Sequence, residues 1–294
     1  MVTHPAGLGP VVIGGLGGSG TRVVAEILHR AGLFIGGDLN GALDNLWFTL
    51  LFKRPAWFRQ CSALGSDGVV QAIEIFEKAM LGPGPWTEEE RALLVAAARE
   101  MSVSGHDHLG SGRGDWPSIR VRKMLDEART TAGPRRVWGW KEPNTQVFVA
   151  ELARYFPGLR FVLVVRPGLD MAFSTNQNQL HAWGDLYGVD VEEPLPRSQL
   201  RYWTASTRTC LERGTRLLGD RFVIVSYDRL CLDPSDEVAR MLAALGIETT
   251  APMEGLAGVP STPDTIGRHR GHDLSLFTAA DLAEAQELEE LLGL

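Results

Sequence analysis

A run of glycines directly after a short apolar segment constrains this chain more than any other feature. Residues 11–13 read Val-Val-Ile, and residues 14–20 read Gly-Gly-Leu-Gly-Gly-Ser-Gly. The next apolar residues recur on one helix face, at Val24, Ile27, Leu28 and Ala31. The pattern predicts a buried strand, a tight turn and a helix. Such a turn directs backbone N–H groups and a helix N-terminus at one spot, which favours an anion, usually a phosphate.

The turn alone fits two kinds of nucleotide site. Gly15, Gly17 and Gly20 match the dinucleotide fingerprint G-x-G-x-x-G, and Asp38 lies near its acidic position. Gly15 and Gly20 also frame a P-loop, in which Thr21 stands at the lysine position. A dinucleotide-binding oxidoreductase and a kinase with a degenerate P-loop are therefore both open at this point.

A third interpretation is a loop that holds a 5′-phosphosulfate. In this interpretation Arg22, in the first helical turn, supplies the cation. The residues that would surround the anion are Gly17, Gly18, Ser19, Gly20 and Thr21. A tight turn without any ligand is the weakest alternative, because so many glycines are needed only where backbone must approach a ligand closely.

The composition excludes several classes of protein. The net charge of −7 disfavours a protein that coats nucleic acid or an anionic membrane. No run of 18 apolar residues occurs and residues 1–10 do not resemble a signal peptide, so we expect no membrane span. The three cysteines, Cys61, Cys210 and Cys231, are widely spaced, which predicts no disulfide framework and a cytoplasmic location.

Three further apolar segments predict strands, at residues 137–140, 161–165 and 222–226. Helical patterns separate them, and they are expected at residues 43–60, 66–80, 87–102, 169–180 and 200–218, after Asp233-Pro234, and after Thr278. This alternation predicts a single α/β domain over residues 1–294, with a central parallel sheet flanked by helices. Residues 43–130 are expected to form a helical insertion or an acceptor-binding lid.

Polar residues follow each predicted strand. Lys141 comes after the second strand, Arg166 after the third and Tyr227 after the fourth. Ligands of parallel α/β sheets bind beyond the carboxyl ends of the strands, so these groups converge with the glycine turn. Two further cations at one edge suit a ligand with two separated phosphates better than they suit a dinucleotide.

Together these segments resemble the sulfotransferases that use 3′-phosphoadenosine 5′-phosphosulfate (PAPS). Residues 18–22 resemble their 5′-phosphosulfate loop. Arg166 at a strand end, followed eight residues later by Ser174 in a helix, resembles their 3′-phosphate signature. Lys141-Glu142-Pro143 is similar to the lysine-x-proline element of the tyrosylprotein and carbohydrate branches.

Two later segments add to the resemblance. Residues 227–246 resemble the strand–loop–helix signature of that family, and residues 266–271 resemble its basic C-terminal loop. The resemblance implies a P-loop-like fold and transfer of a sulfuryl group to a hydroxyl of a small molecule, lipid or carbohydrate, with no metal and no nucleic acid. The implied PAPS-binding residues are Gly17, Gly18, Ser19, Gly20, Thr21, Arg22, Arg166, Ser174, Tyr227, Arg268 and Arg270.

The resemblance also suggests catalytic roles. Negative charge grows on the 5′-phosphate oxygen as the sulfuryl group leaves, and Lys141 and Arg22 are the expected cations there. Cytosolic members have a lysine where this chain has Gly18, so its role would pass to these two residues. The tyrosylprotein branch has a glutamate base soon after the first helix, and Asp38 is the expected base here, with Asp44 as its competitor.

A polar loop over residues 102–115 is a further candidate feature. It is expected to be a lid or an exposed loop. It contains His106 and His108, but no third metal ligand accompanies them in the sequence, so no metal site is predicted there.

Overall fold

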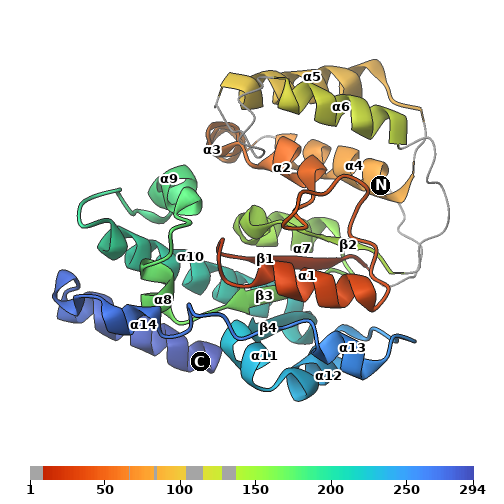
Figure 1. Ribbon diagram of the computed structural model, residues 1–294. Helices are drawn as coiled ribbons and strands as arrows, with labels where there is room; N and C mark the ends of the chain where they lie inside the picture. The colour runs from red at the N-terminus through yellow and green to blue at the C-terminus, as the bar shows by residue number, and fades with distance from the viewer. Residues whose placement is uncertain (1–8, 66, 83–84, 104–114, 128–136) are drawn as a thin grey trace.

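The computed structural model describes residues 9–65, 67–82, 85–103, 115–127 and 137–294 (Figure 1). Four parallel strands form its sheet, in the order β2-β1-β3-β4. Their bounds are β1 Val11–Gly15, β2 Gly139–Lys141, β3 Arg160–Val165 and β4 Phe222–Ser226. The expectation of a single α/β domain with a central parallel sheet is therefore confirmed, because all four predicted segments pair in parallel.

Helices cover both faces of the sheet, so the strands are buried on both sides. On β1, Val11 and Ile13 face one core and Val12 faces the other. The first core includes residues of α1 Thr21–Arg30, α11 Tyr227–Leu232, α12 Pro234–Leu245 and α13 Met253–Ala257. The second core includes residues of α7 Val149–Tyr155, α8 Gly168–Ala172, α10 Leu195–Leu218 and α14 Ala279–Leu292.

Between α1 and β2, the described residues from Leu46 onward are mainly helical, as the sequence indicates. Its helices are α2 Leu46–Phe52, α3 Pro55–Leu64, α4 Gly68–Leu81, α5 Glu88–Val103 and α6 Trp116–Glu127. Figure 1 shows α5 and α6 as an outer layer over α2 and α4. The ring of Phe48 in α2 stacks on Phe52 (4.3 Å between centroids) and on Trp140 of β2 (5.6 Å), so these helices share a core with the sheet.

Two expected helices are broken in the structure. The segment at residues 43–60 forms α2 and α3, because Pro55 begins a new helix and disfavours the helical conformation of the residue before it. The segment at residues 169–180 forms α8 and α9 Asn178–Trp183, and Ser174 lies between them rather than in a helix. The Ser174 hydroxyl accepts a hydrogen bond from the backbone N–H of Asn176 (3.2 Å), and such local bonds compete with helix formation.

Several cap signals are confirmed. Thr278 and Asp281 form a capping box at α14, Thr87 and Glu90 exchange the same bonds at α5, and α12 begins at Pro234 and ends before Gly246. The short helices are η1 Pro143–Phe148, η2 Gly184–Tyr187, η3 Gly219–Arg221, η4 Arg268–Gly271 and η5 Leu274–Leu276.

Other expectations concern cysteines, membrane spans and loops. All three cysteines are free and buried. Among the described residues no helix is long and apolar enough to cross a membrane. Residues 104–114, which include His106 and His108, lie outside the described residues, and so do residues 1–8.

Candidate active site

The glycine turn joins β1 to α1 in a conformation that requires glycine. Gly15, Gly18 and Gly20 have φ angles of 147°, 94° and 97°, which other residues rarely adopt. Gly20 also lies under the ring of Tyr227, because a Cβ placed on Gly20 would be 2.1 Å from Cδ2 of that ring. The predicted strand, turn and helix are confirmed, and the turn packs directly against the residue that follows β4.

The turn has the features of an anion site. The hydroxyl of Ser19 is buried and has no hydrogen-bond partner among the described residues. Thr21 is buried at the start of α1, whereas Arg22 is exposed in the first turn of that helix. Burial raises the pKa of Tyr227 to about 12, and the nearby charges of Arg166 and Arg22 oppose the rise. A buried hydroxyl without a partner, beside a helix N-terminus and a guanidinium, fits a phosphate or sulfate.

The segment from Ser174 to the first turn of α9 supports this turn, and the sequence interpretation singled out only Ser174 in it. Gln179 accepts a hydrogen bond from the N–H of Gly17 (2.5 Å) and donates one to the carbonyl oxygen of Gly15 (3.5 Å). A Cβ on Gly17 would lie 2.5 Å from Nδ2 of Asn176, and one on Gly18 would lie 3.1 Å from Oγ of Ser174. The signal in the sequence was the unbroken polar run at residues 174–179.

Arg166 lies buried at the carboxyl end of β3. Its Nε lies 3.2 Å from an Asp228 oxygen, and Nη1 and Nη2 donate to the hydroxyl and carbonyl oxygens of Thr265 (3.2 and 2.7 Å). Its Nη2 is 3.6 Å from Asp170. Arg166 therefore links β3 to the C-terminal segment, and its binding of a 3′-phosphate stays a prediction.

The C-terminal basic loop is attached to the same place through Asp170. This carboxylate accepts hydrogen bonds from the N–H of Gly267 (2.7 Å) and the N–H of His269 (3.2 Å). It also contacts Nδ1 of His269 (2.7 Å). Burial would raise the pKa of Asp170, but these hydrogen bonds outweigh it and hold the pKa below its usual value. The loop thus returns to the carboxyl end of β3.

Arg268 and Arg270 are placed differently in this loop. Burial lowers the pKa of Arg268, and the charge of nearby Arg166 lowers it further. Arg270 is exposed. The carbonyl oxygen of Thr265 accepts from both Arg268 (3.4 Å) and Arg166 (2.7 Å), so two guanidiniums lie together at the edge where ligands of such sheets bind, with Asp170 and Asp228 as their nearby carboxylates.

Lys141 ends β2 and is buried. Its ammonium donates to a carboxylate oxygen of Asp44 and to the carbonyl oxygen of Ala42 (3.1 Å). Leu43, between these two partners, has a left-handed φ of 62°, which a branched side chain rarely adopts. The short segment over Lys141 is therefore held in a strained conformation.

Asp38 lies on the other side of the same segment. The carbonyl oxygen of Asp38 accepts from the N–H of Leu46 (2.9 Å), while that of Lys141 accepts from Asn45 (2.8 Å). The buried Asp38 carboxylate contacts Arg120 (2.5 Å) and Lys123 (2.9 Å) of α6 through one oxygen. The other oxygen, Oδ2, has no hydrogen-bond partner among the described residues. The sequence interpretation missed both cations, because nothing in the pattern of α6 linked it to the sheet edge.

Glu142 is a second buried carboxyl at this edge that sequence reasoning did not single out. It accepts hydrogen bonds from the N–H and the side-chain amide of Asn144 (2.7 and 2.8 Å). Burial and the charge of Asp44 raise its pKa to about 7, against the opposing effect of Lys53 and Lys141. Four charged side chains therefore act on one another beside β2, namely those of Glu142, Asp44, Lys53 and Lys141.

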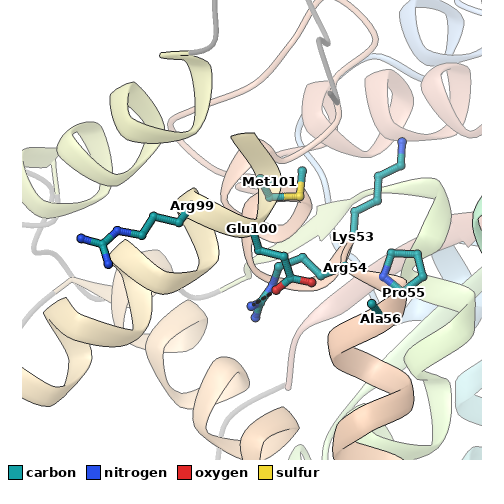
Figure 2. Close-up of a pocket in the computed structure, with 7 residues that line it drawn as sticks. All are labelled: Lys53, Arg54, Pro55, Ala56, Arg99, Glu100 and Met101. Carbon is teal, nitrogen blue, oxygen red and sulfur yellow. Dashed lines mark hydrogen bonds and ion pairs between the residues drawn. The ribbon is translucent and has the colours of Figure 1, made fainter. Parts of the chain in front are cut away.

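A cavity of about 470 Å³ lies between the junction of α2 with α3 and the C-terminal end of α5 (Figure 2). Its surface is mostly apolar. Figure 2 shows Arg54 and Glu100 side by side, and their side chains form an ion pair of 3.0 Å. The residues that line it are Lys53, Arg54, Pro55, Ala56, Arg99, Glu100 and Met101.

Comparison with known proteins decides among the classes that the glycine turn left open. The model of the sulfotransferase family matches residues 10–251, which include all four strands and the glycine turn. The chain belongs to the sulfotransferase family. No curated protein matches its sequence.

Solved structures of sulfotransferases are similar to this one in fold. The sulfotransferase domain from the curacin biosynthetic pathway is 16% identical, with 99% of each chain covered and a TM-score of 0.50. The sulfotransferase domain of the Synechococcus PCC 7002 olefin synthase is 14% identical, with 97% of each chain covered and a TM-score of 0.49. Sulfotransferase STF9 from Mycobacterium avium is 14% identical, with 98% of this chain and 77% of that chain covered and a TM-score of 0.48.

In this sulfotransferase the residues singled out from the sequence form three groups along one sheet edge. The glycine turn packs against Ser174 and Tyr227, and Arg166 lies near Arg268. Lys141 and Asp38 flank the segment that leads into α2. Arg22 and Arg270 are exposed, so their contacts with a ligand stay a prediction.

Proposed function

We propose that this sulfotransferase transfers a sulfuryl group from PAPS to a hydroxyl group of a small-molecule, lipid or carbohydrate acceptor. The observation that carries the proposal is a pair of guanidiniums at the carboxyl end of β3, where the carbonyl oxygen of Thr265 accepts from both Arg166 (2.7 Å) and Arg268 (3.4 Å). The pair adds to the glycine turn, whose Ser19 hydroxyl has no partner among the described residues. A donor with a 3′-phosphate as well as a 5′-phosphosulfate would require two anion sites. A mononucleotide with one phosphate group would require only the first.

The residues present fit such a nucleotide. PAPS supplies an activated sulfuryl group when it is bound. The turn from Gly17 to Thr21 would hold the 5′ end through the Ser19 hydroxyl and the backbone N–H groups of Gly18, Gly20 and Thr21. The N–H groups of Gly17 and Ser19 donate within the protein, to Gln179 and Leu16. Arg166, Arg268 and Ser174 would hold the 3′-phosphate, with Arg270 at its exposed side. Tyr227 would keep the turn and Arg166 in place, because its ring covers Gly20 and lies 5.5 Å from the Arg166 guanidinium.

Positive charge is needed where the bond to sulfur breaks. We assign this role to Lys141 and Arg22. Preorganised cations can stabilise the developing charge without a divalent metal. Lys141 contacts Asp44 in the structure, so its ammonium is already fixed at the end of β2.

The acceptor hydroxyl needs a base within hydrogen-bond reach. We assign this role to Asp38, because Arg120 and Lys123 fix one oxygen of its carboxylate while the other oxygen has no partner among the described residues. Asp44 is the weaker candidate, since its two oxygens accept from Lys141 and from Asn40. Three free cysteines are consistent with a location in the reducing cytoplasm.

Isothermal titration with adenosine 3′,5′-bisphosphate and adenosine 5′-monophosphate tests the donor. We expect the bisphosphate to bind with micromolar affinity and more tightly than the monophosphate. The substitution Arg166→Ala should weaken binding of the bisphosphate by about 2–3 kcal/mol, which is the size of a charged hydrogen bond. It should leave binding of the monophosphate nearly unchanged. Equal affinity of the native protein for both nucleotides would refute the 3′-phosphate assignment.

A further inference from the structure

The cavity between α2, α3 and α5 lies outside the proposed nucleotide site, and the chemistry of its lining points to one class of ligand. We propose that it holds the apolar body of the acceptor, and that the acceptor is an elongated aliphatic or aromatic alcohol rather than a sugar. This inference rests on the proposed function, and it narrows the acceptor classes that the sequence leaves open.

The size and surface of the cavity suit such a body. Its volume of about 470 Å³ falls within the range of about 300–1,000 Å³ that is common for small-molecule sites. Pro55, Ala56 and Met101 contribute apolar atoms, and the charged group of Arg54 is paired with Glu100. A sugar needs several hydrogen-bonding partners around it, and this mostly apolar wall offers few.

Helix α2 connects the cavity to the proposed reaction centre. It begins after Asn45, whose N–H donates to the carbonyl oxygen of Lys141, and it ends before Lys53, which lines the cavity. Its seven residues, at about 1.5 Å each, separate the two places by roughly 10 Å. An acceptor that reaches both must therefore be elongated.

The side chain of Lys53 extends away from Arg54 and Glu100 (Figure 2). Burial lowers its pKa, and the charges of Glu142 and Asp44, which lie beside Lys141, oppose that change. Lys53 thus belongs both to the wall of the cavity and to the charged group at the end of β2. A hydroxyl at the end of an apolar chain would pass from one to the other.

The experiment measures sulfuryl transfer from PAPS to straight-chain alcohols from 1-propanol to 1-octanol, and to glucose. We expect kcat/KM to rise about threefold to fourfold for each added methylene group, as for burial in an apolar site, and glucose to be the poorest acceptor. The variant Ala56→Trp places a large ring at an exposed position on the cavity wall. It should lower kcat/KM for 1-octanol at least tenfold. The value of kcat/KM for 1-propanol and the affinity for adenosine 3′,5′-bisphosphate should stay nearly unchanged.

The matched control is Ala96→Trp, because Ala96 is exposed on α5 and does not line the cavity. It should retain the dependence on chain length. Calorimetric binding of 4-octylphenol gives a readout without turnover, and Ala56→Trp should abolish it while Ala96→Trp should not. A flat chain-length series with intact bisphosphate binding would overturn this inference and leave the proposed function standing. Absence of transfer to every acceptor and of bisphosphate binding would overturn both.

Discussion

At the scale of single residues, variants of the buried pair Lys141 and Asp44 test whether Lys141 has a catalytic or a structural role. The variant Lys141→Met keeps the length of the side chain and removes its charge. If the ammonium stabilises charge that develops only in the transition state, kcat should fall about 10²–10³-fold while the affinity for adenosine 3′,5′-bisphosphate changes little. Steady-state kinetics and calorimetry on the same preparation measure the two effects.

The single variant also leaves Asp44 buried without its cation, which costs stability. The double variant with Lys141→Met and Asp44→Asn removes both charges and should recover the unfolding midpoint of the native protein. Its kcat should stay low. Recovery of kcat together with stability would show that Lys141 acts only by supporting the structure.

Asp38 is tested by the variant Asp38→Asn, which keeps the shape of the side chain but cannot accept a proton. We expect a loss of rate of about 10²–10⁴-fold with an aliphatic alcohol and a smaller loss with an acidic phenol, which is already partly ionised. The measurement is kcat/KM for both acceptors. A nearly native rate on both would move the base to another residue, with Asp44 examined next.

At the scale of elements, two glycines of similar conformation flank α1, and only the first lies at the junction of β1 with α1. Gly20 and Gly32 have φ angles of 97° and 104°, so alanine is strained at either position. Only Gly20 lies against Tyr227, whereas nothing lies within 4 Å of a Cβ on Gly32. Gly20→Ala should therefore weaken nucleotide binding more than tenfold and lower the melting temperature more than Gly32→Ala does.

Adding Tyr227→Ala to Gly20→Ala separates the two causes. It removes the ring that the new Cβ would meet, so it should recover part of the lost thermal stability. If the double variant is no more stable than Gly20→Ala, the contact between Gly20 and Tyr227 is not what limits this position.

At the scale of the whole molecule, the buried carboxyl of Glu142 makes the free energy of unfolding depend on pH. Its pKa is about 7 in the folded protein, compared with 4.5 as its ordinary value, so the folded state binds more protons between these two values. Stability should therefore fall as the pH rises from about 4.5 to 7, by about 3 kcal/mol for this group. Glu142→Gln should remove that fall, as measured by urea unfolding at pH 5 and pH 8.

The exposed residue Glu254 provides the matched control, since Glu254→Gln should leave the native pH dependence unchanged. The same fall in stability in Glu142→Gln and in the native protein would assign the pH dependence to another group. Asp44, Lys53 and Lys141 are the charged side chains that act on Glu142, so each would then be replaced in turn.

The sequence by itself determined the elements whose signals are local. Four apolar segments of strand length, together with glycine and capping signals, were enough to predict the parallel sheet and most helices around it. The positions of Lys141, Arg166 and Tyr227 after three of these strands also placed them at one edge, because parallel strands end on the same side. These inferences needed only the period of apolar residues and the conformational limits of glycine and proline.

The tertiary structure decided what depends on contacts between distant segments. The cations that fix Asp38 come from α6, 82 and 85 residues further along the chain, and Gln179 reaches Gly17 across 162 residues. No periodic pattern encodes such pairings, because each depends on how packed helices place two side chains together. The surroundings of Asp38 and the cavity beside Lys53 therefore follow from packing, whereas the edge of the sheet that carries them follows from the sequence.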